Sequence, residues 1–223
     1  MFVDYDGTIT DVDTFDVLVR AFAGDGAWDA IEAEFAAGQI TLREALRREA
    51  AALRLAPADA LAFLESRAHF DPTFASFVRA ARAHGAAICV VSAGIRQAIE
   101  PALARAGVDV AVYANDVDFD PNGWRLKFID DSDQGHDKAG RVRAARAAGA
   151  YTIYVGDGIS DFEGALAADE IFAKRNRALE RFARERGLRV RSFATFDEIE
   201  RALFPTGSPG SPAGPAAAGP VGR

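Results

Sequence analysis

Short apolar segments alternate with amphipathic helical segments along most of this chain, and this alternation constrains the fold more than any other feature. The first expected strand begins at residue 2, and later strands are expected at residues 87–91, 108–113, 151–155, 171–173 and 188–193. A β-hairpin is expected at residues 116–128. Helical patterns separate them. Apolar strands that alternate with helices form parallel sheets covered on both faces. We therefore predict an α/β fold with a Rossmann-like parallel sheet.

One long segment interrupts this alternation. Its apolar residues recur at helical spacing, Thr41 and Glu44 form a capping-box pattern, and Pro57 is placed to begin a further helix. The segment therefore predicts a separate helical cap. After Phe204 the chain consists mainly of Gly, Pro, Ala and Ser without periodicity, which is typical of a disordered tail. The predicted division is a core domain (1–11 and 71–204), an all-helical cap (12–70) and a tail (205–223).

Composition excludes several classes of protein. A net charge of −7 argues against a nucleic-acid binder or a polybasic membrane binder. The single cysteine, Cys89, excludes an intramolecular disulfide and a cysteine-rich zinc site. Without a signal peptide or a long apolar run, we expect a soluble cytoplasmic protein. The first strand begins at the second residue, so either it is short or the natural start lies slightly upstream. Oligomeric state is left open.

Three predicted strands end in polar turns that contain glycine. The turns are DYDGT (residues 4–8), SAG (92–94) and GDGISD (156–161), and Lys138 begins a helix between the second and the third. Ligands of an open parallel sheet bind beyond the carboxyl ends of its strands. We therefore expect these segments to meet in one site.

The acidic residues of these turns indicate a cation. Asp4 and Asp6 lie two residues apart, so in extended backbone they face the same side. Asp157 and Asp161 add further negative charge, which is costly unless a cation lies among the carboxylates. Hard oxygen ligands without grouped His or Cys favour Mg²⁺. Lys138 supplies a further positive charge.

Such a set suits phosphoryl transfer. One carboxylate attacks phosphorus, and the second protonates the leaving alkoxide and later takes a proton from water. Thr8, Ser92 and the backbone N–H groups of the glycine turns can donate hydrogen bonds to a phosphate. Each turn taken alone is also explained by ordinary turn chemistry. Their joint occurrence at successive strand ends favours the functional interpretation.

At these residues the sequence resembles the haloacid-dehalogenase-like superfamily of phosphatases. The motifs are DYDGTIT (4–10), VVSAG (90–94), the lysine of GHDKAG (135–140) and VGDGISDFEGA (155–165). The resemblance implies that Asp4 is the nucleophile and Asp6 the general acid and base. It implies a phosphate site made of Thr8, Ser92, Ala93, Gly94 and Lys138. It also implies a Mg²⁺ site made of Asp4, Asp6, Asp157 and Asp161.

Within this superfamily the helical cap resembles that of phosphoserine phosphatase relatives, and the chain is most similar to the methionine-salvage phosphatases. Phosphoserine phosphatases carry a Glu near the position of Asp13 and a carboxylate-binding Arg near the position of Glu49. Arg47 and Arg48 lie beside Glu49. An acidic residue where that Arg is expected disfavours phosphoserine. Asp13 also fits the first turn of a helix as a simple structural residue.

The predicted function is therefore Mg²⁺-dependent hydrolysis of a small phosphorylated metabolite, with neither nucleic acid nor membrane as partner. A phosphoserine phosphatase-type enzyme is the first alternative. A phosphotransferase, a phospho-acceptor module and a binding protein on the same fold are the others. Asp6, placed to activate water, and the cap argue against a phospho-acceptor module.

Overall fold

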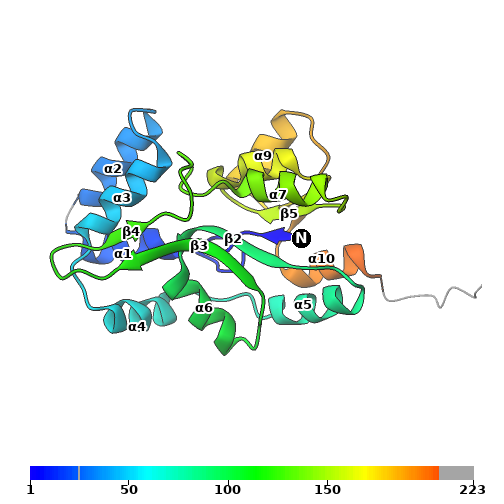
Figure 1. Cartoon of the computed structure of the whole chain (residues 1–223), viewed down its shortest axis with the longest axis horizontal. Helices are drawn as coiled ribbons and strands as arrows, with labels where there is room; N and C mark the ends of the chain where they lie inside the picture. The colour runs from blue at the N-terminus through cyan, green and yellow to red at the C-terminus, as the bar shows by residue number, and fades with distance from the viewer. Residues whose placement is uncertain (25, 206–223) are drawn as a thin grey trace, which may run out of the picture.

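The computed structural model describes residues 1–24 and 26–205, and among these residues the strands form one seven-stranded sheet. The strand order is β4-β3-β2-β1-β5-β6-β7, and every pairing is parallel except that of β3 with β4. The strands are β1 (Phe2–Val3), β2 (Cys89–Ile95), β3 (Ala111–Asp118), β4 (Arg125–Lys127), β5 (Ile153–Gly156), β6 (Glu170–Lys174) and β7 (Val190–Phe193). The predicted α/β fold is confirmed (Figure 1).

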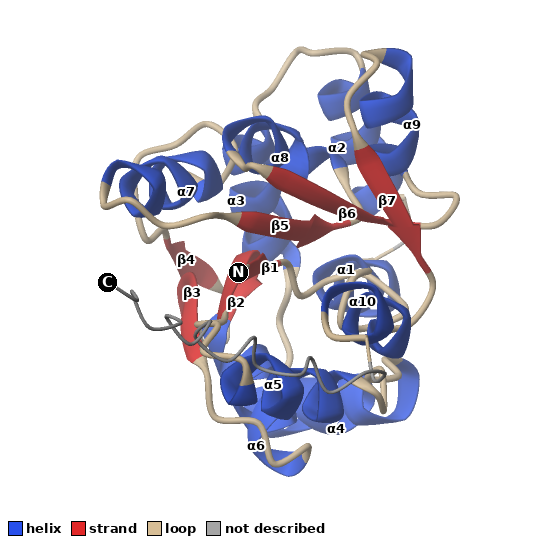
Figure 2. Cartoon of the chain, turned by 90° about the vertical axis from the view of Figure 1, so that its right-hand side faces the viewer, coloured by secondary structure: helices blue, strands red, loops and turns tan. Residues whose placement is uncertain are grey.

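Helices cover both faces of the sheet (Figure 2). One layer contains α5 (Phe74–Ala83), α6 (Arg96–Arg105) and α10 (Phe196–Leu203). The other contains α7 (Lys138–Ala147), α8 (Phe162–Ala167) and α9 (Ala178–Glu185).

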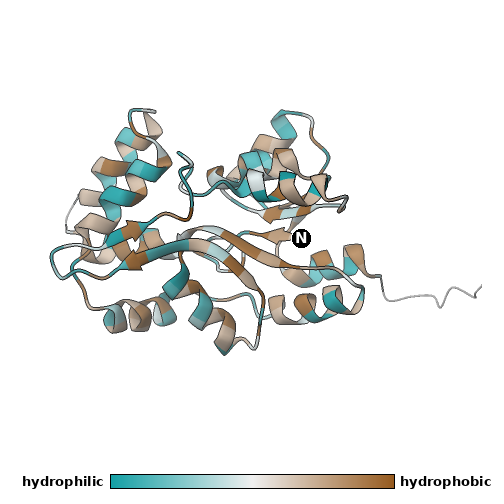
Figure 3. Cartoon of the chain, viewed as in Figure 1, coloured by the Kyte–Doolittle hydropathy of each residue, from teal (hydrophilic) through white to brown (hydrophobic). Residues whose placement is uncertain are grey.

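Each layer packs its own buried cluster against the strands. Phe74, Ile99 and Phe196 pack with Val3 on one face, whereas Val142 and Leu179 belong to the cluster on the other. The helices carry both hydrophobic and hydrophilic residues (Figure 3), as expected of helices with one buried side.

Two strands extend further than the sequence predicted. Instead of ending at Val91, β2 runs to Ile95, although its register with β3 shifts between Val91 and Ile95. The shift leaves Ser92 and Gly94 outside the regular pairing while they remain on the strand. Instead of ending at Tyr113, β3 runs to Asp118, because its far half pairs with β4 and forms the predicted hairpin.

The predicted helical segment contains four helices within its described residues. They are α1 (Thr14–Phe22), α2 (Ala27–Ala36), α3 (Leu42–Ala52) and α4 (Pro57–Arg67). The side chains of Thr41 and Asp13 cap α3 and α1, respectively. Leu18 and Leu53 belong to a buried cluster that also contains Trp124 of the hairpin. The division into core and cap remains a prediction.

Most of the predicted tail, residues 206–223, lies outside the described residues. Within the described ranges, no helix combines the length and the apolar character that a membrane crossing requires.

Candidate active site

The turns predicted to form the site lie at adjacent central strands. Asp4 and Asp6 follow β1, Ser92 lies on β2, Asp157 follows β5 and Lys138 begins α7. The first four line one cavity of about 240 Å³, and Lys138 contacts this group through Asp4. The structure therefore brings together residues up to 153 positions apart in the chain, from Asp4 to Asp157.

Lys138 forms the electrostatic centre of the site. Its Nζ donates to Asp4 Oδ1 and to Asp161 Oδ1, each at 2.7 Å, and to Ser160 Oγ at 3.1 Å. Burial alone would lower the pKa of Lys138, but Asp161 and Asp4 raise it above its usual value. Burial, followed by repulsion from Asp161, raises the pKa of Asp4 well above the ordinary range. A buried lysine thus remains charged and partly neutralises a cluster of carboxylates.

Asp6 is held by donors from two different segments. Its Oδ1 accepts from the Thr14 backbone N–H at 2.9 Å and from Thr14 Oγ1 at 2.5 Å, and its Oδ2 accepts from Ser92 Oγ at 3.3 Å. Burial raises the pKa of Asp6, while the hydrogen bonds from Thr14 act in the opposite direction. A Cβ at Gly94 would lie 2.5 Å from Asp6 Oδ2, so the absence of a side chain there allows this approach.

The DGT turn packs against Asp157. Gly7 has φ +70°, and a Cβ on it would lie 2.3 Å from Asp157 Oδ2. Thr8 Oγ1 donates to Asp157 Oδ1 at 3.3 Å, and Lys174 Nζ donates to the Thr8 carbonyl at 3.0 Å. Burial, followed by repulsion from Asp161, raises the pKa of Asp157 to about 7. This turn therefore requires glycine both for its backbone conformation and for its packing.

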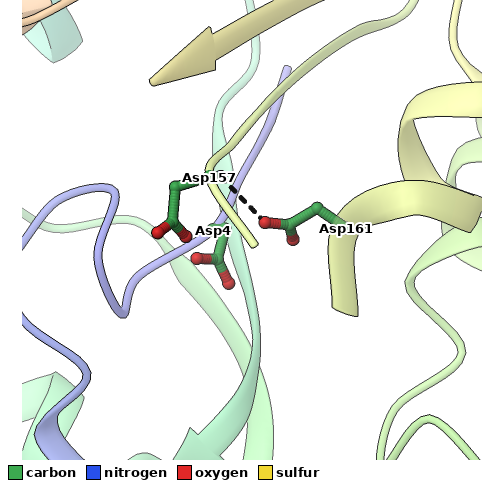
Figure 4. Close-up of side chains that lie close together, drawn as sticks. All are labelled: Asp4, Asp157 and Asp161. Carbon is green, nitrogen blue, oxygen red and sulfur yellow. Dashed lines mark hydrogen bonds between the residues drawn. The ribbon is translucent and has the colours of Figure 1, made fainter. Parts of the chain in front are cut away.

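Three carboxylates are close enough to share a metal ion. Oxygen atoms of Asp4, Asp157 and Asp161 all lie within 4.8 Å of one another. Figure 4 shows the carboxylates of Asp4 and Asp157 side by side, with Asp161 on the far side of the Asp157 backbone. Such an all-oxygen donor set fits Mg²⁺.

Asp161 is already engaged by other groups. Its Oδ2 accepts from the N–H groups of Asp157 and Gly158, and its Oδ1 accepts from Lys138 and from Tyr154 Oη. These bonds suit a residue that holds the loop in place. Asp4 and Asp157 are therefore the better placed metal ligands.

The segment from Asp13 to the end of α3 contributes four carboxylates and an apolar wall to the same cavity. The carboxylates are Asp13, Asp16, Glu32 and Glu49, and the apolar residues are Phe15, Phe35, Leu42 and Leu46. Of the predicted specificity residues, Asp13 and Glu49 line the cavity, and Asp13 also caps α1.

Arg47 and Arg48 do not line this cavity, contrary to what their position beside Glu49 suggested. Arg47 pairs with Glu44, while Arg48 pairs with Glu44 and Glu34. They lie on a different side of α3 from Glu49, because successive helical residues point in different directions.

Several site residues were not singled out in the sequence. Ser160 lies within the GDGISD motif and could have been found there, but Thr14, Tyr154 and Arg177 carry no local signal. His136, in the loop before α7, is buried, and its Nδ1 lies 3.1 Å from the Ser92 carbonyl. Burial lowers the pKa of His136 to about 4. A neutral imidazole therefore supports the strand that carries Ser92.

Comparison with known sequences identifies the family of this chain. Residues 1–166 match the family model described as haloacid dehalogenase-like hydrolase. The chain is 31% identical over 214 residues to the 2-hydroxy-3-keto-5-methylthiopentenyl-1-phosphate phosphatase of Brevibacillus brevis, covering 91% of this chain and 94% of that one. It is 28% identical over 214 residues to Pdp3-interacting factor 1 of Schizosaccharomyces pombe, with coverage of 91% and 93%.

Among solved structures, a phospho-aspartyl intermediate analogue of phosphoserine phosphatase superposes with a TM-score of 0.68. The superposition covers 91% of this chain and 96% of the other, at 18% sequence identity. This similarity supports the fold.

Proposed function

Since the chain belongs to the haloacid dehalogenase-like hydrolases, we propose that it is a Mg²⁺-dependent phosphatase that hydrolyses a phosphomonoester of a small metabolite through an aspartyl-phosphate intermediate. The observation that carries the proposal is the buried contact of Lys138 with Asp4, beside Asp6 and Asp157 in one cavity. A nucleophile, an acid, a cation and phosphate donors thus share one site.

The reaction has two steps. In the first, an Asp4 carboxylate oxygen bonds to phosphorus, the bond from phosphorus to the leaving oxygen breaks, and Asp6 gives its proton to that oxygen. In the second, Asp6 takes a proton from water, the water oxygen bonds to phosphorus, and the aspartyl bond breaks to release phosphate. Burial raises the pKa of Asp6, which favours the protonated form that the first step needs.

Asp4, Asp157 and the Asp6 carbonyl would hold Mg²⁺, with Asp161 supporting Asp157 through its backbone N–H. When bound, Mg²⁺ supplies positive charge that reduces the repulsion between phosphate and carboxylates. Thr8, Ser92, Lys138 and the N–H groups of residues 93 and 94 are the proposed phosphate donors. Gly94 N–H donates to Ser92 Oγ at 2.9 Å in the free protein.

The substrate is proposed from the relatives and the cavity. A volume of about 240 Å³ accommodates only a small phosphoester. The named activity of the Brevibacillus brevis relative makes a methionine-salvage phosphoester the first candidate. Phosphoserine is the second candidate, supported by the similar fold of phosphoserine phosphatase.

Hydrolysis of an aryl phosphate tests the chemistry without knowledge of the natural substrate. We expect turnover with Mg²⁺, none with EDTA, and a loss of at least about 10³-fold in Asp4→Asn, because the nucleophile is removed. Residual Mg²⁺-dependent turnover at the wild-type rate in Asp4→Asn would contradict the covalent mechanism. A stable, hydroxylamine-sensitive adduct from acetyl phosphate without turnover would instead support a phospho-acceptor module.

A further inference from the structure

The cap side of the cavity carries more negative charge than phosphate hydrolysis requires. Asp13, Asp16, Glu32 and Glu49 line it together, and we call these four residues the cap acid cluster. Among the described residues that line the cavity, Arg177 is the one cation. Arg177 acts electrostatically on Asp157 of the core motif, which places it with the catalytic turns.

Glu49 distinguishes this cluster from an ordinary acidic surface. Its side chain is buried, with 2% of the residue exposed, and within the described chain its Oε1 has no hydrogen-bond partner. By contrast, Asp13 Oδ1 accepts from two backbone N–H groups, and Asp16 Oδ1 accepts from Trp28 Nε1 at 3.2 Å. A buried acceptor without a donor is destabilising, and such an atom in a cavity wall is suited to a donor on a ligand.

The charges around Glu49 decide which ligand fits. Burial, followed by repulsion from Asp16 and Glu32, raises the pKa of Glu49 to about 8. A carboxylate on the substrate would meet the same repulsion from Asp16 and Glu32, and opposing like charges disfavours its binding in a desolvated site. A hydroxyl or ammonium group would instead donate to Glu49 Oε1.

We infer that the cap acid cluster is a specificity subsite that binds a hydrogen-bond donor without negative charge, a hydroxyl or an ammonium group, on the leaving alcohol, and that it excludes a leaving-group carboxylate. This inference rests on the phosphatase function proposed above. The apolar residues beside the cluster, Phe15, Phe35, Leu42 and Leu46, contact the carbon skeleton of the leaving group.

Two matched substrate pairs test the exclusion of carboxylates. Glycerol 3-phosphate differs from 3-phosphoglycerate by a hydroxymethyl group in place of a carboxylate. Phosphoethanolamine differs from phosphoserine by the loss of a carboxylate. In each pair we expect the member without the carboxylate to have at least about a 100-fold higher kcat/KM, given the cost of opposing like charges. The first pair tests a hydroxyl donor and the second an ammonium donor.

Variants of Glu49 identify the acceptor. Glu49→Leu removes it and lowers kcat/KM for the preferred substrate by about 10- to 100-fold, because the ligand donor loses its partner. Glu49→Gln keeps an acceptor oxygen but cannot ionise when an ammonium group binds beside it, so an ammonium substrate loses about 10-fold and a hydroxyl substrate only a few-fold. Glu44→Gln on the same helix is the matched control, because Glu44 pairs with Arg47 and Arg48 and does not line the cavity.

Binding measurements separate this inference from the catalytic proposal. Calorimetry of the same pairs with the Asp4→Asn protein reports on the subsite even if the wild-type protein shows no turnover of an aryl phosphate. Absence of that turnover would refute the proposed function. Equal or tighter binding of the carboxylate-bearing members, or a preference that survives Glu49→Leu unchanged, would overturn the subsite.

Discussion

Replacing Lys138 by methionine removes the buried ammonium group that contacts Asp4 and Asp161, each at 2.7 Å. At an effective dielectric constant of about 20, each contact corresponds to about 6 kcal/mol of Coulomb attraction, which is largely offset by desolvation of the three groups. Removing one partner of a buried ion pair typically costs about 3–5 kcal/mol, because the remaining charge stays buried. We expect a loss of that size in the free energy of unfolding at pH 8.

The loss should decrease toward acidic pH. Burial and Asp161 already raise the pKa of Asp4 well above its usual value, and removal of the cation raises it further. A carboxyl group whose pKa is higher in the folded state destabilises the protein progressively as pH rises above its unfolded value of about 4. If the folded variant binds one more proton than the folded wild type, the difference between their free energies of unfolding changes by about 1 kcal/mol per pH unit.

Urea denaturation in EDTA at pH 5 and pH 8 measures both effects. Lys127→Met is the matched control, because Lys127 pairs with Asp118 at the same 2.7 Å distance but its side chain is 63% exposed. Exposed pairs contribute less than about 1 kcal/mol. A loss below about 1 kcal/mol for Lys138→Met at pH 8, or a loss that does not change with pH, would refute the electrostatic reasoning.

Three further predictions concern the catalytic turns and the cap. Glu49→Gln should raise the Tm at pH 8.5 but not at pH 5, because the wild-type protein loses stability as pH rises from about 4.5 toward the folded-state pKa of Glu49 of about 8; equal shifts in Tm at both pH values would contradict this. Gly7→Ala should lower both stability and kcat, because its Cβ would lie 2.3 Å from Asp157 Oδ2. Gly38→Ala, with a similar φ of +68° but open space around the Cβ, should lower stability alone, and a normal kcat in Gly7→Ala would rule out the packing argument. Asp6→Asn should slow alkyl phosphate hydrolysis by about 10²- to 10⁴-fold and aryl phosphate cleavage much less, with the phosphoenzyme accumulating; rapid-quench assays showing equal slowing of phosphoenzyme formation from both substrates would argue against an acid role.

The catalytic turns were predictable because their signals are local. Asp4, Asp6, Ser92 and Asp157 each follow or lie on an apolar strand, and the carboxyl ends of neighbouring parallel strands meet at one edge of a sheet. The sequence therefore indicated which residues converge. The ends of β2 and β3 were predicted too early, because pairing with a neighbouring strand extends them beyond their apolar runs.

The partners of those residues depended on tertiary structure. Thr14 donates hydrogen bonds to the Asp6 carboxylate, and Tyr154 donates one to Asp161, yet neither residue lies in a recognisable sequence pattern. Likewise, Glu49 faces the cavity while Arg48, one residue earlier, pairs with Glu34 outside it. Which side of a helix faces the site depends on how that helix packs.

The sequence by itself thus determined the α/β fold, the family resemblance and the residues at the strand ends, because these follow from patterns within short segments. Tertiary structure alone decided that Lys138 lies between Asp4 and Asp161, and that the acids of the cap meet in one cavity. The physical reason is that charge interactions depend on distances of a few ångströms, and only the packing of helices against the sheet sets those distances.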